Sequence, residues 1–560
     1  MQIKPDNPLI VQGDGKVLLE TKHPRYEEVR DFLGRFAELE ASPELLHTYR
    51  IGPLSLWNAA SAGLDVDVII DGLRGYSKFD VPQDVLDTIR DTIERYGLVK
   101  IVPHPKDDTE HLRLQFASGY VAKLIANEPT LKEFVVPDGR RHWNILAGHR
   151  GIFKQRALQA GWPVEDIAGF REGEPLETVL RDTMVGNGKP FKPRHYQVEA
   201  ASRWWQDGHP SGGCGVVVLA CGAGKTIVAM TAMSLVQTKT LILATNQAAV
   251  SQWRRELLDK THLTEDDVGM YTGSHKKISP VTIATYQILT WRRSKKAEFE
   301  HLHLFEDQDW GLIIYDEVHL LPAPVFGATA TLQGRRRLGL TATLVREDGR
   351  EGDVFALVGP KRYDLPWQTL QQQGFIADTR CVEIRVPLPR AVFNRYEAAR
   401  EAEKFRIASA NPAKLDVIQE LLRQHREDNV LIIGTYVDQL HTIAKRFRTP
   451  LITGKTPHSE REVLFGKFRK GTIKVLVVSK VANFSIDLPD ANVAIQVSGT
   501  FGSRQEEAQR LGRILRPKKK TAVFYTVVSG DTKEQDFAMK RQLFLTEQGY
   551  RYHIDDRAQG

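Results

Sequence analysis

In the middle of the chain, strand-like and helix-like patterns of apolar and polar residues alternate. Between Arg194 and about Leu365, short apolar runs rich in valine and isoleucine are separated by longer stretches with helical periodicity. This alternation is typical of a parallel sheet with helices on both faces. The runs predicted to be strands are Val216–Leu219, Leu241–Ala244, Val281–Ala284, Leu312–Tyr315 and Leu338–Thr341.

The same alternation resumes after Leu415, so we expect a second α/β lobe of similar build. Its predicted strands are Val430–Ile433, Leu451–Ile452, Val475–Val478, Val493–Val497 and Ala522–Val528.

The first 190 residues carry weaker patterns. Two short apolar runs flank the turn at Gly13–Gly15 and predict a β-hairpin, and helical patterns follow at 26–39, 52–62 and 82–96. Residues 126–190 are broken by glycine and proline, which favours a small α/β module. Four basic residues in this module either meet phosphates or form a solvated face, and they are His149, Arg150, Lys154 and Arg156.

The first predicted strand runs into a small-residue turn and then Lys225-Thr226. Backbone N–H groups of such a turn curl around a polyphosphate, the lysine neutralises the outer phosphates, and the threonine hydroxyl binds Mg²⁺. Leu219 stands where the full motif has glycine, so a glycine-rich turn without a ligand is the alternative. The residues predicted to bind nucleotide here are Cys221, Gly222, Ala223, Gly224, Lys225 and Thr226.

A second motif follows about ninety residues later, where the apolar run Leu312–Tyr315 ends in Asp316 and Glu317. We assign Asp316 to Mg²⁺ and Glu317 to the water that attacks ATP. A solvated strand end is the alternative for an isolated Asp-Glu pair. After a phosphate loop, the pair indicates a Walker B box, so the sequence predicts an ATPase that uses ATP and Mg²⁺. Two α/β lobes with one such site predict tandem RecA-like lobes.

Length, charge and cysteine content set limits on the rest. A chain of 560 residues holds about three to five domains. The net charge of +7 permits a polyanionic partner, and three cysteines without a C-x-x-C pair favour a reducing cytosol over a disulfide or zinc framework. No apolar run approaches the roughly 18 residues of a membrane span, so we expect a cytoplasmic protein without a membrane partner.

The segment 509–516 suggests a contribution of the second lobe to the ATP site. It begins at Gln509, and Arg513 and Arg516 are three residues apart, on one face of a predicted helix. Arginine forks bind phosphate oxygens in pairs, so both are candidates for fingers on the γ-phosphate. An ordinary basic helix face is the alternative.

Other short blocks have the order of a nucleic-acid motor. Arg194 and Gln197 precede the phosphate loop, and Gln197 is a candidate to read the adenine edge; Thr341 and Thr343 end a strand and are candidates to link hydrolysis to lobe movement. Residues predicted to face a DNA strand are Asn246, Gln252, Thr285 and Tyr286. Any one of these is compatible with ordinary loop chemistry, but their order is hard to obtain by chance.

That order resembles superfamily 2 helicases, and several blocks narrow the resemblance to the XPB family of DNA repair helicases. The resemblance covers most of residues 191–555. The blocks that carry it are Val318-His319, the stretch 338–348 with Arg346, Glu347 and Asp348, the stretch 479–489 that opens with Ser479 and Lys480, the stretch 501–516, and the stretch 541–550. Residues 346–348, 479 and 480, together with Thr435, are the other residues predicted to contact nucleic acid or to couple ATP hydrolysis to movement.

The resemblance implies a 3′-to-5′ DNA helicase of nucleotide excision repair that opens duplex DNA at single-strand junctions, with Arg346, Glu347 and Asp348 acting in duplex opening. The compact chain is similar to the bacterial type. The implied domains are an XPB-like accessory domain at 1–125, a damage-recognition-like module at 126–190, lobe 1 at 191–365, and lobe 2 at 366–560 with a helical thumb near 390–410 whose charges are mixed.

Two other functions stay open. The chain is either a duplex translocase that levers DNA apart without processive unwinding, or a scaffold that recruits a repair nuclease and uses ATP binding as a switch. A scaffold has no need of Glu317 or Arg516, so their presence favours an enzyme.

Overall fold

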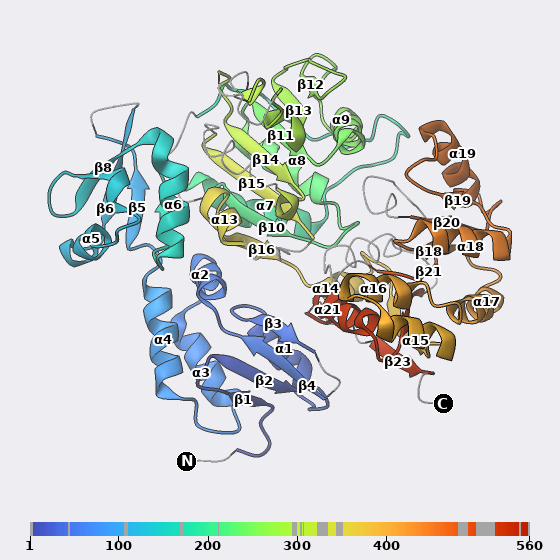
Figure 1. Ribbon diagram of the computed structural model, residues 1–560. Coiled ribbons are helices and arrows are strands. Elements are labelled where there is room, and N and C mark those ends of the chain that lie inside the picture. The colour runs from blue at the N-terminus through green and yellow to red at the C-terminus, as the bar shows by residue number, and fades with distance from the viewer. Residues whose placement is uncertain are drawn as a thin grey trace. The chain divides into compact units, whose positions relative to one another are not determined.

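The computed structural model, whose helices and strands are labelled in Figure 1, divides into two compact units. One unit contains Met1–Leu219 and Gly224–Asp364, and the other contains Ala220–Ala223 and Leu365–Gly560. The structure describes residues 4–42, 45–105, 110–168, 172–210, 212–293, 299–302, 305, 307–321, 334–342, 351–479, 491–499, 521–547, 550 and 552–557. Among the helices in these ranges, none combines the length and the apolar content that crossing a bilayer demands.

The first unit opens with a four-stranded antiparallel sheet in the order β1-β2-β4-β3. The predicted hairpin is confirmed, because Leu9 pairs with Leu19 across the turn at Gly15. The helix predicted at 26–39 is too long: it ends at Leu33, and an alternating segment after Gly34 forms β3. The strands are Leu9–Val11, Lys16–Glu20, Glu38–Ala41 and Leu46–Arg50, and helices α1–α4 are Tyr26–Leu33, Pro53–Ser61, Val66–Tyr76 and Gln83–Glu94.

A separate five-stranded sheet follows in the order β7-β8-β6-β5-β9. Its first two strands lie before residue 125, so the domain boundary expected there falls inside this sheet. Phe116 and Phe153 lie in its core. The strands β5–β9 are Val99–Val102, His111–Phe116, Val135–Pro137, His142–Leu146 and Val164–Asp166, and helices α5 and α6 are Gly119–Ala126 and Arg150–Gln159.

Two of the basic residues considered for phosphate binding are instead internal. Arg150 and Lys154 on α6 are 4% and 6% exposed, and both bind the carboxylate of Asp166 at the end of β9, with Lys154 Nζ at 2.9 Å. Burial raises the pKa of this carboxyl, but the two cations outweigh burial and hold it well below its usual range. Both sequence interpretations, phosphate contact and a solvated face, are therefore wrong for this pair.

The rest of the first unit forms lobe 1, a seven-stranded sheet in the order β12-β13-β11-β14-β15-β10-β16 in which every pairing is parallel. All five residues of β11 and of β13 are buried, as expected for strands covered on both faces. The strands β10–β16 are Cys214–Val218, Thr240–Ala244, Val268–Tyr271, Val281–Thr285, Leu312–Asp316, Arg336–Thr341 and Lys361–Asp364.

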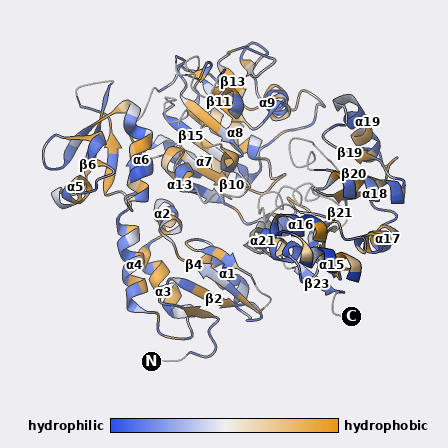
Figure 2. Ribbon diagram, in the orientation of Figure 1, coloured by the Kyte–Doolittle hydropathy of each residue, from blue (hydrophilic) through white to orange (hydrophobic). Residues whose placement is uncertain are grey.

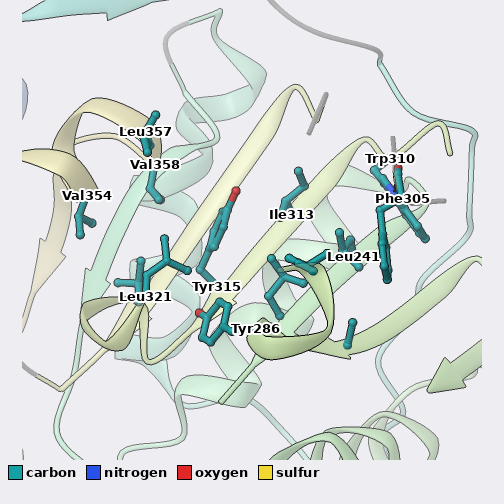
Figure 3. Packing of buried hydrophobic residues seen from close by; sticks show 14 of the residues in the cluster. Leu241, Tyr286, Phe305, Trp310, Ile313, Tyr315, Leu321, Val354, Leu357 and Val358 are labelled. Carbon is teal, nitrogen blue, oxygen red and sulfur yellow. Dashed lines mark hydrogen bonds between the residues drawn. The ribbon is translucent and has the colours of Figure 1, made fainter. Parts of the chain in front are cut away.

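Helices pack on both faces of this sheet, and the apolar residues concentrate on its central strands (Figure 2). Trp310, Tyr315 and Tyr286 belong to one buried cluster with Val216 and Leu241 (Figure 3). The helices with described bounds are α7 His195–Trp205, α8 Lys225–Val236, α9 Gln247–Lys260, α10 Tyr286–Leu289 and α13 Glu351–Leu357.

The second unit contains lobe 2, whose sheet has the order β19-β20-β18-β21-β22-β17-β23, again with parallel pairings throughout. The segment 390–410 contains two helices, α15 Arg390–Ala398 and α16 Glu401–Ser409. The strands β17–β23 are Thr379–Val386, Val430–Ile433, Leu451–Ile452, Val475–Val478, Val493–Gln496, Ala522–Ser529 and Tyr552–Asp556. The other helices are α14 Trp367–Gln372, α17 Lys414–Gln424, α18 Val437–Phe447, α19 His458–Arg469 and α21 Lys533–Glu547.

Candidate active site

The predicted phosphate loop joins β10 to α8 at the carboxyl edge of the lobe 1 sheet. Gly222 and Gly224 have φ of 83° and 84°, a left-handed conformation that glycine adopts at low cost. Gly224 directly precedes α8, so the loop ends at a helix N-terminus, where backbone N–H groups favour an anion. The backbone therefore has the form that phosphate binding requires.

Gln197 lies against this loop. Its side chain is 4% exposed, and a Cβ added to Gly224 would lie 2.4 Å from its Nε2. Its Oε1 accepts the backbone N–H of Arg194 at 2.8 Å, which caps the start of α7, and the Arg194 guanidinium donates to Tyr196 Oη at 3.1 Å. The structure thus places Gln197 beside the phosphate loop, while its contact with adenine stays a prediction.

Lys225, the first residue of α8, meets the carboxylate that follows β14. Its Nζ lies 3.2 Å from Oε1 of Glu317, and the two side chains are 11% and 21% exposed. Glu317 has a φ of 50° and ψ of 54°, a left-handed conformation that is uncommon outside glycine and frequent at functional sites. Residues 92 positions apart in the chain are thereby brought together.

Asp316 is the last residue of β14 and carries an unusual charge environment. Burial raises the pKa of its carboxyl to about 6, with a further contribution from neighbouring Glu317, while Trp253 and Lys225 act in the opposite direction. A divalent cation stabilises two adjacent carboxylates of this kind. Carboxylate and hydroxyl oxygens suit Mg²⁺, so Asp316 and the half-buried Thr226 fit the ion predicted from the sequence.

A short polar contact connects the Walker B segment to the next strand. His319 Nδ1 lies 2.6 Å from Oγ1 of Thr341, the last residue of β15, and 3.5 Å from Oε2 of Glu317. Both His319 and Thr341 are buried. Thr341, a predicted coupling residue, is therefore one hydrogen bond from His319, which follows the predicted catalytic carboxylates and has no role indicated by its sequence pattern.

The four residues predicted to face DNA divide into two pairs. Asn246 caps α9 by accepting the backbone N–H of Ala249 at 3.0 Å and is half-buried, and Gln252 is exposed. Thr285 and Tyr286 are 7% and 2% exposed. Their burial disfavours direct DNA contact by these two side chains and leaves a coupling role for them.

In lobe 2, Thr435 and Ser479 follow the carboxyl ends of β18 and β20. Thr435 Oγ1 donates to the carbonyl of Gly499 at 3.0 Å, and the backbone N–H of Ser479 donates to Ile452 at 2.9 Å. Eight predicted site residues lie outside the described ranges, and they are Thr343, Arg346, Glu347, Asp348, Lys480, Gln509, Arg513 and Arg516.

Three parts of the chain match known protein families. Residues 190–346, which hold the loop and the carboxylates, match the family described as type III restriction enzyme, res subunit. Residues 370–560 match ERCC3/RAD25/XPB C-terminal helicase, and residues 9–138 match a helicase conserved C-terminal domain.

Curated relatives match over almost the whole chain. The DNA 3′-5′ helicase XPB of Kineococcus radiotolerans is 51% identical over 557 residues, covering 98% of this chain and 97% of that protein. The DNA 3′-5′ helicase XPB of Mycobacterium tuberculosis is 50% identical, with 98% of each chain covered. The general transcription and DNA repair factor IIH helicase/translocase subunit XPB of Encephalitozoon cuniculi is 33% identical, covering 98% of this chain and 82% of that protein. The chain therefore belongs to the XPB family of DNA 3′-5′ helicases.

Proposed function

We propose that this chain hydrolyses ATP to move 3′ to 5′ along DNA and open the duplex, and that it serves nucleotide excision repair. The observation that carries the proposal is the meeting of Lys225 with Glu317, beside Asp316, where a phosphate loop reaches the sheet edge. A binding module has no need of a lysine and two carboxylates in this arrangement. The names of the relatives supply the substrate class, DNA.

The residues of lobe 1 have distinct tasks in hydrolysis. Backbone N–H groups around Gly222 and Gly224 donate to the phosphates, and Lys225 exchanges Glu317 for phosphate oxygens when ATP enters. Glu317, released from the lysine, orients a water for attack on the γ-phosphorus and takes its proton as the bond to the bridging oxygen breaks. Asp316 and Thr226 would hold Mg²⁺, which would supply positive charge to the phosphates.

Residues from other parts of the chain complete the proposed cycle. Gln197 and Arg194 select adenine, which their place beside the phosphate loop supports. Arg513 and Arg516, in the motif that begins at Gln509, stabilise the γ-phosphate as ATP closes the lobes. Their forked guanidinium groups suit phosphate oxygens.

DNA binding is assigned to carboxyl-edge residues of both lobes. In lobe 1, the accessible Asn246 and Gln252 contact the strand, and Thr341 with Thr343 relays hydrolysis to it. In lobe 2, the proposed DNA residues are Thr435, Ser479 and Lys480. These residues suit phosphate contacts, which position DNA without reading its sequence.

The test measures ATP turnover without DNA and with single-stranded, forked and duplex DNA, and strand displacement on forks with a 3′ or a 5′ loading strand. For a helicase, single-stranded DNA stimulates ATP turnover. Strand displacement then occurs only on the fork with a 3′ loading strand, and it requires ATP rather than a non-hydrolysable analogue. Stimulation by duplex without displacement identifies a translocase instead. If neither fork is unwound and ATP changes only the binding of DNA, the chain is a scaffold.

Duplex opening is assigned to Arg346, Glu347 and Asp348. Replacing all three by alanine should preserve most DNA-stimulated ATPase, because the residues around ATP are untouched, and abolish unwinding of a forked duplex. Arg350→Ala, which removes a charge from the adjoining stretch, is the control and should unwind normally. Equal loss of ATPase and unwinding would place the triplet in the ATP cleft.

Incision is assigned to a second protein, a repair nuclease. The purified chain should leave supercoiled DNA intact in the presence of ATP and Mg²⁺. Nicking that depends on this chain and survives in Lys225→Ala would contradict the assignment.

A further inference from the structure

Two buried aromatic side chains hold Asp316 from two different helices. Trp253 on α9 is 3% exposed, and its Nε1 donates to Oδ2 of Asp316 at 2.8 Å. Tyr286 at the start of α10 is 2% exposed, and its hydroxyl donates to the backbone carbonyl of Asp316 at 2.7 Å. Figure 3 shows Tyr286 beside Tyr315, the residue that precedes Asp316 on β14. Both the side chain and the backbone of this residue are thus fixed.

The polar atoms of these aromatics serve more than core filling. Phenylalanine fills comparable volume and requires no partner, whereas a buried N–H or O–H costs free energy unless it is hydrogen-bonded. Two other aromatics of the same lobe satisfy that requirement away from the site. Trp310 Nε1 donates to the carbonyl of Phe305 at 2.8 Å, and Tyr271 Oη lies 3.2 Å from His301 Nδ1. Trp253 and Tyr286 differ because both converge on a single site residue.

The helix that carries Trp253 begins where the DNA strand is assigned. Asn246 caps α9, and exposed Gln252 directly precedes buried Trp253, so neighbouring residues of one helix face solvent and the Walker B strand. Thr285 precedes α10, but it is buried and its side chain does not cap that helix. Close-packed interiors transmit displacement, and an indole has only two side-chain torsions through which to absorb it. A small shift of α9 therefore moves Asp316.

We propose that Trp253 and Tyr286 are positioning residues of the Walker B aspartate: Trp253 links it to the DNA-facing helix α9, Tyr286 holds its backbone from α10, and together they make ATP turnover respond to DNA. The link rests on the DNA path of the proposed function. It adds a route that starts at Gln252 and reaches Asp316 within lobe 1, separate from the His319–Thr341 contact on the other neighbouring strand.

The test replaces each donor by phenylalanine, as Trp253→Phe and Tyr286→Phe, with Trp310→Phe and Tyr271→Phe as matched controls. The controls remove the same donors from the same lobe without touching Asp316. The measured quantity is the ratio of ATP turnover with single-stranded DNA to turnover without it. We expect this ratio to fall about tenfold in Trp253→Phe, since a hydrogen bond to a charged group is lost, and about threefold in Tyr286→Phe. Both controls should keep the wild-type ratio.

Two further measurements separate coupling from folding and from DNA contact. The Mg²⁺ concentration for half-maximal turnover should rise in Trp253→Phe and stay at the wild-type value in Trp310→Phe, which a merely structural loss would not produce. Nucleotide-free affinity for labelled single-stranded DNA should be unchanged in Trp253→Phe and weakened in Gln252→Ala.

Several results would overturn the link. One is an equal loss of DNA stimulation in Trp253→Phe and Trp310→Phe. Another is a fall of ATP turnover in Trp253→Phe by the same factor with and without DNA. If Trp253→Phe lowers the unfolding temperature more than Trp310→Phe, Tyr286→Phe, which keeps every carbon atom, decides the outcome. Wild-type turnover that ignores DNA would instead refute the proposed function itself.

Discussion

The two seven-stranded sheets have one topology and different chemistry. Numbered in chain order, β10–β16 and β17–β23 each become strands 1 to 7, and both sheets then have the order 3-4-2-5-6-1-7. Every pairing in both is parallel. The carboxyl ends of equivalent strands can therefore be compared directly.

The loops after the first strands differ in what their backbones can donate. In lobe 1, β10 leads into Gly222 and Gly224, whose left-handed φ lets successive N–H groups converge on an anion. In lobe 2, β17 leads into Pro387 and Pro389, and proline has no N–H. The same strand position thus supports a phosphate site in one lobe and not in the other.

The ends of the fifth strands differ in charge. β14 ends at Asp316 and is followed by Glu317, both half-buried, whereas β21 ends at Gln496 and is followed by Val497, which are 1% and 0% exposed. The comparison teaches that the parallel sheet provides positions for a site. The residues at the strand ends decide whether a site exists.

Lobe 2 uses its buried lysine for structure. Lys414 Nζ lies 2.7 Å and 2.8 Å from the two carboxylate oxygens of Glu534 and donates to the carbonyl of Val497 at 2.8 Å. Both side chains of the pair are 1% exposed. Burial lowers the pKa of Lys414, and Glu534 opposes that shift. Lys225, by contrast, stays accessible for a ligand.

Lys225→Ala should give the largest effect and break the site in lobe 1. We expect ATP turnover to fall by about 1,000-fold, because the charge on the outer phosphates loses its partner. Thermal unfolding should be nearly unchanged, since the pair with Glu317 is partly exposed. Turnover is measured at saturating DNA, and substantial remaining ATPase would refute the nucleotide site.

Lys414→Met should have the opposite profile. Leaving Glu534 buried without its cation should cost about 3–5 kcal/mol of unfolding free energy. Chemical denaturation measures this cost, and the double variant with Glu534→Gln should recover much of it. The exposed pair Arg406–Asp438 is the control, and Arg406→Ala should be silent. A stable Lys414→Met protein without ATPase would place this lysine in catalysis.

Glu317→Gln puts an amide directly after the strand end of lobe 1, at the position that Val497 occupies in lobe 2. The variant should bind ATP normally and hydrolyse it about 100-fold more slowly, because the shape is kept and the proton acceptor is lost. Nucleotide affinity and single-turnover rates measure the two effects separately. Wild-type turnover would mean that another residue orients the water.

Gly224→Ala should have the smallest effect of the four. The added Cβ meets the Gln197 amide, and the left-handed φ costs about 1–2 kcal/mol for alanine. We expect ATP affinity to weaken about tenfold while the lobe stays folded. Gly466→Ala in lobe 2, where a Cβ meets nothing within 4 Å among described atoms, is the matched control. Equal affinity in both variants would contradict the role of this glycine.

The sequence determined the central strands and the chemistry at their ends. Continuous apolar runs such as Val430–Ile433 and Val475–Val478 coincide with β18 and β20, because strands buried on both faces tolerate few polar residues. The sequence also showed the phosphate-loop motif and the Asp-Glu pair, which the structure places at one edge of the lobe 1 sheet, while their roles toward ATP stay predictions. The family resemblance is confirmed by relatives of 50% identity and more.

Tertiary structure decided those strands and side-chain contacts that no local sequence pattern indicates. Among the strands of the two lobes, β12, β16, β17 and β23 were not predicted. Three of them lie at sheet edges, where polar residues such as those of Lys361–Asp364 are tolerated, and the interior strand β17 has its apolar run interrupted by Arg380, Glu383 and Arg385. The contact of Trp253 with Asp316 joins residues 63 apart, and that of Lys225 with Glu317 joins residues 92 apart. Such pairs form only when parallel strands bring their carboxyl ends to one edge, a condition that periodicity along the chain does not encode.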